Sequence, residues 1–129
     1  MALRFFPMAL VMAAIFLLSH TPGNNFPAAA AGVDKLCHAV AYATLGATFL
    51  FALHPRVRNR NFLPTAAVVV LFCLLYGITD EFHQSFIPGR FPSRLDIVAD
   101  TFGGLLSVFC WQWWRNRRRS RMSPIADSR

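Results

Sequence analysis

Two polar stretches interrupt this otherwise apolar chain, and both contain residue types that can bind ligands or transfer protons. The longer stretch, YGITDEFHQSFIPGRFPSRLDIVAD at 76–100, combines four acids with two arginines, a histidine and a glutamine. The shorter stretch is VDKLCHAVAY at 33–42. Carboxylates and an imidazole in a partly dry site can hold a ligand, a proton or a metal ion. What they do here depends on the elements that position them.

Helical spacing places most groups of the shorter stretch on one face. Asp34 and His38 are four residues apart, so on a helix they lie one turn apart, with Tyr42 one turn deeper. Lys35 points elsewhere and can extend its amine to the lipid headgroups.

The longer stretch has a similar pattern at its start. Tyr76, Asp80 and Gln84 are spaced by four and His83 follows Asp80 by three, so these residues share a face if the helix persists. Glu81 is rotated about 100° from that face.

A stripe of small and polar residues opens the last apolar segment. Asp96, Asp100, Gly103 and Ser107 follow a 4-3-4 spacing, with Gly104 beside them. Small residues let a neighbouring helix approach closely, and acids are better placed inside a bundle than against lipid. A charged side chain deep in a bilayer costs about 2.5 to 3.5 kcal/mol, so these acids must be paired or functional.

Composition indicates that lipid is the solvent of this chain. With 55% hydrophobic residues and thirteen Phe among 129 residues, it is too apolar for an ordinary soluble domain. Apolar segments at 5–19, 36–53, 62–79 and 95–114 are expected to be helices. A spanning helix needs about 20 apolar residues, which the last three approach and the first does not. We therefore predict an all-α fold, with one transmembrane domain at 1–114 that is a multi-pass bundle of four transmembrane helices.

The first segment has a second interpretation as a cleaved signal peptide. Arg4 precedes the apolar run, and an alanine-rich stretch follows at 28–31. A long gap containing Pro22 and Pro27 separates the run from those alanines, which disfavours cleavage.

Arginines set the orientation of the predicted bundle. They precede the first segment, fill the loop between the second and third, and follow the fourth. Because Lys and Arg remain in the cytoplasm, both termini are predicted inside, and both polar stretches face outward. The basic tail at 115–129 is expected to be cytoplasmic and disordered. Although the net charge is +7, the arginines border apolar runs and form no groove-fitting patch, so no nucleic-acid partner is predicted.

The three cysteines, Cys37, Cys73 and Cys110, lie inside apolar runs at no ligand-like spacing. We expect all three to be buried small hydrophobic residues.

The polar groups have three interpretations. In a structural network, Arg90 and Arg94 pair with the acids of the longer stretch, and His38 pairs with Asp34. In a ligand site, the same groups form an outward-facing pocket. A metal site is the third, but DEFHQ lacks the second histidine of H-E-x-x-H, so neither a metal nor a cofactor is assigned. Its available oxygen and nitrogen ligands would be Asp34, His38, Asp80, Glu81, His83 and Asp96.

Three motifs in a fixed order resemble the VanZ-like family of small bacterial integral membrane proteins. They are LSHTPG, VDKLCHAVAYATLG and DEFHQSFIPGRFPSRLDIVADTFGG, within which D-K-x-x-H followed by tyrosine and D-E-x-x-Q-x-F-x-P-G-R are the most specific. The resemblance implies a protein of the bacterial cytoplasmic (inner) membrane. The family is named for a member associated with teicoplanin resistance, which is a phenotype of particular members. The signature residues carried over are Asp34, Lys35, His38, Tyr42, Asp80, Glu81, Gln84, Arg90 and Asp96.

One position departs from the family pattern. Where the family often has asparagine before the T-x-G step, this chain has Asp100, which adds a negative charge. We include it among the ligand-binding candidates.

The expected function is binding or protection of a cell-envelope component, such as a lipid or a cell-wall precursor, by this outward pocket. A glycopeptide-resistance-type role is one form it could take. The alternative is a membrane enzyme acting on a lipid-linked substrate, with His38 or Glu81 as general base and Arg90 binding phosphate. No nucleophile is recognisable, so no catalytic residue is assigned and the non-catalytic function is favoured. Apart from the bilayer and this ligand no partner is predicted, and the oligomeric state is left open.

Overall fold

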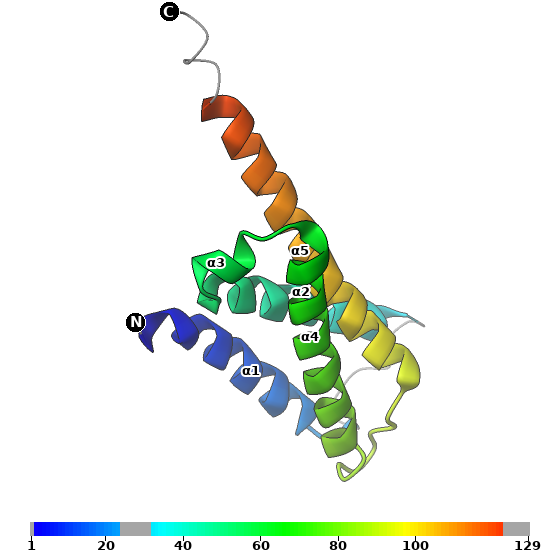
Figure 1. Ribbon diagram of the computed structural model, residues 1–129. Coiled ribbons are helices and arrows are strands. Elements are labelled where there is room, and N and C mark those ends of the chain that lie inside the picture. Colours follow the sequence, from blue (N-terminus) through cyan, green and yellow to red (C-terminus); the bar gives the residue numbers. More distant parts are fainter. Residues whose placement is uncertain (1, 24–31, 123–129) are drawn as a thin grey trace, which may run out of the picture.

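The computed structural model describes residues 2–23 and 32–122, and the regular elements in these ranges are all helices (Figure 1). The expectation of an all-helical chain is therefore confirmed, and all four predicted helices are present. Two of them, α2 and α4, are long and apolar enough to cross a membrane. In chain order the elements are η1 (Ala2–Phe5), α1 (Phe6–Ser19), α2 (Val33–Ala52), α3 (Pro55–Arg58), α4 (Phe62–Gln84) and α5 (Arg94–Met122).

Local sequence explains where the central helices begin and end. Gly32, which precedes α2, has a φ of 95°, a left-handed conformation that glycine adopts without strain. After α2, Leu53 is extended, and Pro55 occupies the first position of the short helix α3, where a missing N–H costs nothing. Pro64 lies in the first turn of α4 for the same reason.

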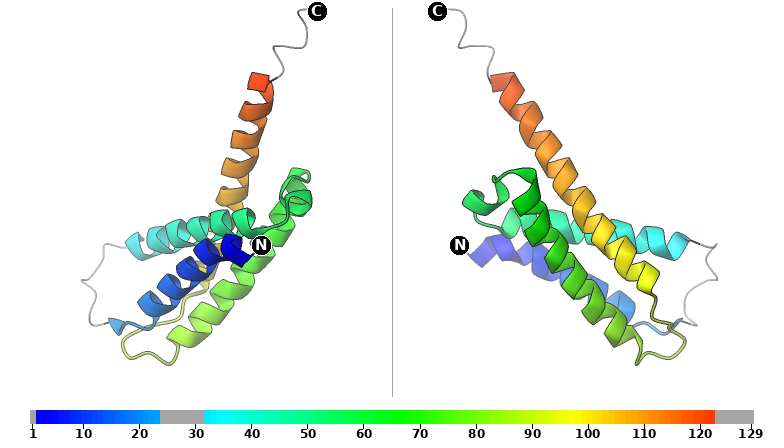
Figure 2. Two further views of the ribbon diagram at one scale, coloured as in Figure 1. Left: turned by 90° about the vertical axis from the view of Figure 1, so that its left-hand side faces the viewer. Right: turned by 45° about the vertical axis from the view of Figure 1, so that its right-hand side comes forward.

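Glycines set the contact between α2 and α5, which cross obliquely (Figure 2). A Cβ atom at Gly103 would lie 2.8 Å from the backbone nitrogen of Ala43, and one at Gly46 would lie 3.3 Å from Cα of Gly104. The first distance leaves no room for a methyl group, and the second would require the α5 backbone to shift by a few tenths of an ångström. The small-residue stripe of α5 thus packs inside the molecule, against α2, as its spacing predicts.

The distribution of polar and apolar side chains differs from that of an ordinary soluble protein. Among the described residues, as many polar or charged side chains are buried as hydrophobic ones. Large apolar side chains are exposed instead, such as Leu63 at 78%, Phe82 at 67% and Phe102 at 59%. Exposed apolar surface of this extent marks contact with lipid or a partner.

Two helices end later in the sequence than predicted. The helix expected to end at Thr79 continues to Gln84, so the DEFHQ motif is helical. The last helix continues to Met122, so the expected disorder of the basic tail is wrong for 115–122. Arginine is a good helix former, and the guanidinium of Arg118 lies 4.0 Å from the centre of the Trp114 ring, one turn earlier. Residues 123–129 and the alanines at 28–31 lie outside the described ranges.

The prediction for the cysteines is correct for one of the three. Cys73 is buried, whereas Cys37 and Cys110 are exposed. Apolar neighbours in sequence do not identify the inward face of a helix when the outward face is apolar too.

The arginine-rich segments gather at one end of the molecule. Trp111 Nε1 of α5 donates to the backbone oxygen of Arg58 at 3.2 Å, and Gln112 Nε2 donates to that of Arg60 at 3.2 Å. The element η1 lies beside α3 in each view (Figures 1 and 2). The end of α4 and the start of α5 lie at the opposite end (Figure 1).

Candidate functional site

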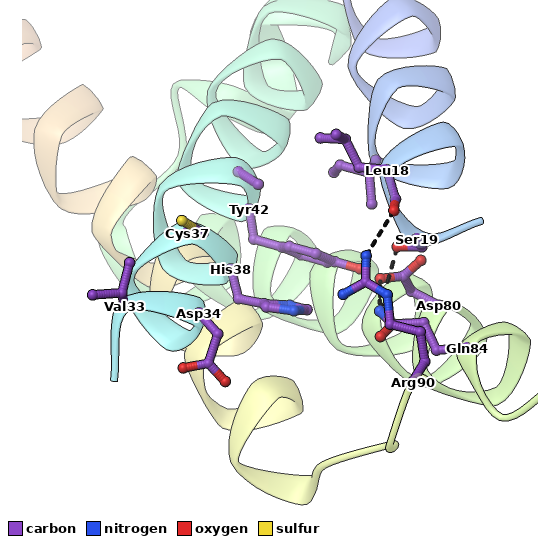
Figure 3. A pocket seen from close by; sticks show the side chains of 12 residues that line it. Leu18, Ser19, Val33, Asp34, Cys37, His38, Tyr42, Asp80, Gln84 and Arg90 are labelled. Carbon is purple, nitrogen blue, oxygen red and sulfur yellow. Dashed lines mark hydrogen bonds between the residues drawn. The ribbon is translucent and has the colours of Figure 1, made fainter. Parts of the chain in front are cut away.

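A cavity of about 450 Å³ opens between α1, α2, α4 and the loop before α5 (Figure 3). Apolar side chains such as Ile15, Leu18 and Ala41 form one part of its wall. The other part contains six of the ten predicted site residues, drawn from both polar stretches: Asp34, His38, Tyr42, Asp80, Gln84 and Arg90.

The α2 side of the cavity follows from helical spacing alone. His38 and Tyr42, one turn apart, both extend from α2 toward Asp80 of α4 (Figure 3). Tyr42 is only 1% exposed, and its hydroxyl oxygen is buried without a hydrogen-bond partner. Folded proteins seldom leave a buried polar atom unpaired, so this hydroxyl is a notable feature of the cavity wall.

Asp100, the residue that departs from the family pattern, pairs with His38. His38 Nδ1 donates to Asp100 Oδ1 at 2.9 Å, and Asp100 is fully buried. The expected His38–Asp34 pair is therefore wrong. The close contact at Gly103 brings the start of α5 against the His38 face of α2, so the nearer carboxylate belongs to another helix.

Lys35 links two predicted site residues rather than pointing away from them. Its Nζ lies 2.8 Å from Asp34 Oδ2 and 2.8 Å from Asp96 Oδ1. The prediction that Lys35 points elsewhere is thus wrong, because its long stem can bend across the α2–α5 contact. Asp96 Oδ2 also lies 3.9 Å from His38 Nε2.

The end of α4 contributes two adjacent acids that are both buried. Gln84 Nε2 donates to Asp80 Oδ2 at 3.1 Å and to Ser19 Oγ of α1 at 3.3 Å. Glu81 Oε2 accepts from the backbone N–H of Ser93 at 2.6 Å, while its Oε1 is buried without a partner. Glu81 does not itself line the cavity, and the loop before α5 covers it through this contact with Ser93.

Arg90 fixes this loop to the end of α1. Its Nε donates to the Thr21 backbone oxygen at 3.1 Å and its Nη2 to the Leu18 oxygen at 2.8 Å. The last carbonyls of a helix lack intrahelical donors and carry partial negative charge, so they attract a guanidinium. The ion pairs expected of Arg90 and Arg94 with the acids of the longer stretch do not occur among the described residues, and Arg94 is exposed.

Sequence reasoning missed a histidine pair beside the cavity. His20 Nδ1 lies 3.2 Å from His83 Nε2, and the two rings stack, with Phe16 against His83. The signal was the position of His20 within LSHTPG, one of the three motifs in the sequence.

Within residues 2–23 and 32–122, one group of side chains could hold a metal ion. His38, Asp80 and Glu81 each offer a ligand atom, and these atoms all lie within 4.8 Å of one another. With Asp100 on the other nitrogen of His38, the site offers three carboxylates around one imidazole, beside an apolar wall.

Comparison with known proteins identifies a family. A family model described as VanZ/LLP1 matches residues 3–115, which include every candidate site residue. No curated protein and no solved structure matches the chain significantly.

Proposed function

Because this chain belongs to the VanZ/LLP1 family, which is membrane-associated, we propose that it is a four-span protein of the bacterial cytoplasmic membrane with both termini inside. The arginine-rich segments at one end of the molecule support this orientation, since such segments stay cytoplasmic. Trp111, Trp113 and Trp114 lie beside them, where an interfacial aromatic belt is expected. The cavity at the other end would then open at the outer face.

The function proposed for that cavity is binding or protection of an amphipathic cell-envelope component, such as a lipid or a lipid-linked wall precursor. One observation carries the proposal: two polar stretches about forty residues apart in sequence line the same cavity. Its volume of about 450 Å³ lies within the 300–1,000 Å³ of small-molecule sites. The apolar wall suits a hydrocarbon chain, and the polar residues suit a headgroup.

Lipid retention tests this proposal. Protein extracted gently from its native membrane would be compared, by mass spectrometry of bound lipids, with an Asp80→Asn, Arg90→Gln double variant. The matched control is Arg94→Gln, which removes an exposed arginine that does not line the cavity. A lipid retained by wild type and control but lost from the double variant supports the proposal. Equal retention by all three proteins contradicts it.

A membrane enzyme is the second candidate, and the His38–Asp100 pair favours it. A buried carboxylate that accepts from one ring nitrogen orients a histidine as a general base. Purified protein would be incubated with envelope lipids, with and without divalent metal, and products sought by mass spectrometry. A product that disappears in His38→Gln supports catalysis, and its absence under all conditions contradicts it.

A glycopeptide-resistance-type role is a narrower form of the binding proposal. Expression in a glycopeptide-sensitive host would then raise the teicoplanin concentration needed to stop growth. Unchanged susceptibility to teicoplanin, with the protein present in the membrane, would contradict the resistance role. It would not contradict lipid binding, which the retention experiment tests separately.

A further inference from the structure

We propose that His38, Asp80 and Glu81 bind one divalent metal ion, Zn²⁺ or Mn²⁺, at the inner end of the cavity. Their ligand atoms lie within 4.8 Å of one another. Ligands of one such ion, each about 2.0 to 2.2 Å from it, can be about 4 Å apart. Small side-chain rotations therefore bring all three atoms onto one ion.

Buried polar atoms without partners surround this group. Glu81 Oε1, Asp100 Oδ2 and the Tyr42 hydroxyl are buried and lack a hydrogen-bond partner, and their residues are 4%, 0% and 1% exposed. Native structures seldom leave buried polar atoms unpaired, because an unmade hydrogen bond is costly. A metal ion with a bound water would satisfy Glu81 directly and give the other two atoms a polar neighbour.

The Asp100–His38 hydrogen bond is the arrangement that supports a metal-ligating histidine. Because Nδ1 donates to Asp100 Oδ1, the lone pair is left on Nε2. Histidines that bind metal through one nitrogen commonly donate from the other to a carboxylate, which orients the ring and makes it a better ligand. Asp100 would thus position His38 without touching the ion.

The negative charge of the buried acids also favours a bound cation. Asp80, Glu81 and Asp100 are each at most 5% exposed. Asp100 contacts His38, which is uncharged when its Nε2 lone pair is free, so this histidine does not balance the charge of the three acids. Lys35 is engaged by Asp34 and Asp96 instead. Clustered carboxylates at a membrane face are stabilised by a bound cation, and a mixture of imidazole and carboxylate ligands suits Zn²⁺ or Mn²⁺ better than Mg²⁺.

Two of the three ligands, His38 and Asp80, also line the cavity, so an open coordination position would face it. A phosphate oxygen of an envelope lipid could occupy that position. This last step alone rests on the function proposed above. Metal binding stands without it.

Metal binding can be measured on full-length protein that carries no histidine tag. The protein would be stripped with chelator in detergent, loaded with Zn²⁺ or Mn²⁺, and assayed by elemental mass spectrometry and titration calorimetry. We expect about one ion per chain. Glu81→Gln should weaken binding at least tenfold, while the amide oxygen keeps the acceptor for the Ser93 N–H. His54→Gln, which removes an exposed histidine between α2 and α3, away from the cavity, should bind as wild type does.

Further variants keep the proposal falsifiable if Glu81→Gln fails to fold. His38→Gln removes the nitrogen ligand, and Co²⁺ substitution reports its loss as a change in the visible absorption bands. His83→Gln tests the His20–His83 pair as a rival site. Absence of stoichiometric Zn²⁺ or Mn²⁺ in wild type, or binding lost only in His83→Gln, overturns the proposal. Metal bound without any retained envelope lipid contradicts the proposed function instead.

Discussion

Oδ1 of Asp100 lies 2.9 Å from Nδ1 of His38, in a contact that joins α5 to α2 beside the cavity. The other carboxylate oxygen points toward α4, where a Cβ atom at Gly77 would lie 2.7 Å from it. Glycine at position 77 therefore provides the space for Asp100. Three helices meet around one carboxylate, so the residue that departs from the family pattern is central to both packing and chemistry.

Replacement of Asp100 by asparagine should separate these two roles. The amide oxygen can still accept from His38 Nδ1, so the helical circular dichroism and the unfolding temperature of metal-free protein should stay near wild type or rise. Loss of the negative charge should weaken Zn²⁺ binding about 10- to 100-fold, as for other carboxylates that orient a ligating histidine. Calorimetric titration measures this effect. Asp100→Leu, which also removes the acceptor, should unfold at a lower temperature than Asp100→Asn, and wild-type affinity in the asparagine variant would rule out the positioning role.

Replacement of Gly103 by alanine should loosen the α2–α5 contact. The added methyl would meet the Ala39 and Ala43 backbone, which cannot yield as a flexible side chain can. Overpacking of this kind costs about 1 to 3 kcal/mol. Thermal unfolding in detergent, followed by circular dichroism, measures the loss. Ala47→Val adds volume at an exposed position of the same helix pair and should change little, so equal effects would show that the contact is not tight.

Sequence reasoning located the helices and the shared face of Asp34, His38 and Tyr42, because helical spacing is a local property. The partners of these residues depend on how α2 crosses α5, which no local pattern encodes. For that reason His38 pairs with Asp100 rather than Asp34. Arg90 illustrates a second limit: it binds backbone carbonyls of α1, and every residue has a carbonyl, so side-chain types give no signal for such a contact.

Loss of the Lys35 amine should reduce the stability of the protein more than loss of the charge on Asp34, its exposed partner. Lys35→Met leaves Asp96, whose side chain is 10% exposed, without its cation, whereas Asp34→Asn removes only an acid that is 53% exposed. The methionine variant should therefore unfold at the lower temperature. Lys35→Arg should recover part of the loss. Thermal scans of all three variants in detergent decide the matter, and a larger loss in Asp34→Asn would assign the main interaction of Lys35 to Asp34.

The proposed orientation predicts where reporter fusions are active. Alkaline phosphatase folds only outside the cytoplasm, so a fusion after Arg90 should be active, and one after Arg60 should not. Green fluorescent protein, which fluoresces when its fusion point is cytoplasmic, should be bright at the C-terminus. Activity after Arg60, or a dark C-terminal fusion that is nevertheless expressed, would contradict a cytoplasmic location for both termini.

The two tyrosines of the chain allow a comparison between a hydroxyl that supports the fold and one that could serve a ligand. Tyr76 donates to the Met12 backbone oxygen of α1 at 2.8 Å, whereas the Tyr42 hydroxyl is buried and has no partner. Tyr76→Phe should cost about 0.5 to 1.5 kcal/mol of stability, the net contribution of one hydrogen bond.

Tyr42→Phe removes an unpaired polar atom, so metal-free protein should be as stable as wild type or more so. Its effect should appear as weaker retention of metal or lipid, because Tyr42 lines the cavity. Thermal unfolding and ligand retention, measured on both variants, test the pair together. Unchanged retention with lowered stability in Tyr42→Phe would make that hydroxyl a structural group and remove one of the three unpaired atoms on which the metal site rests.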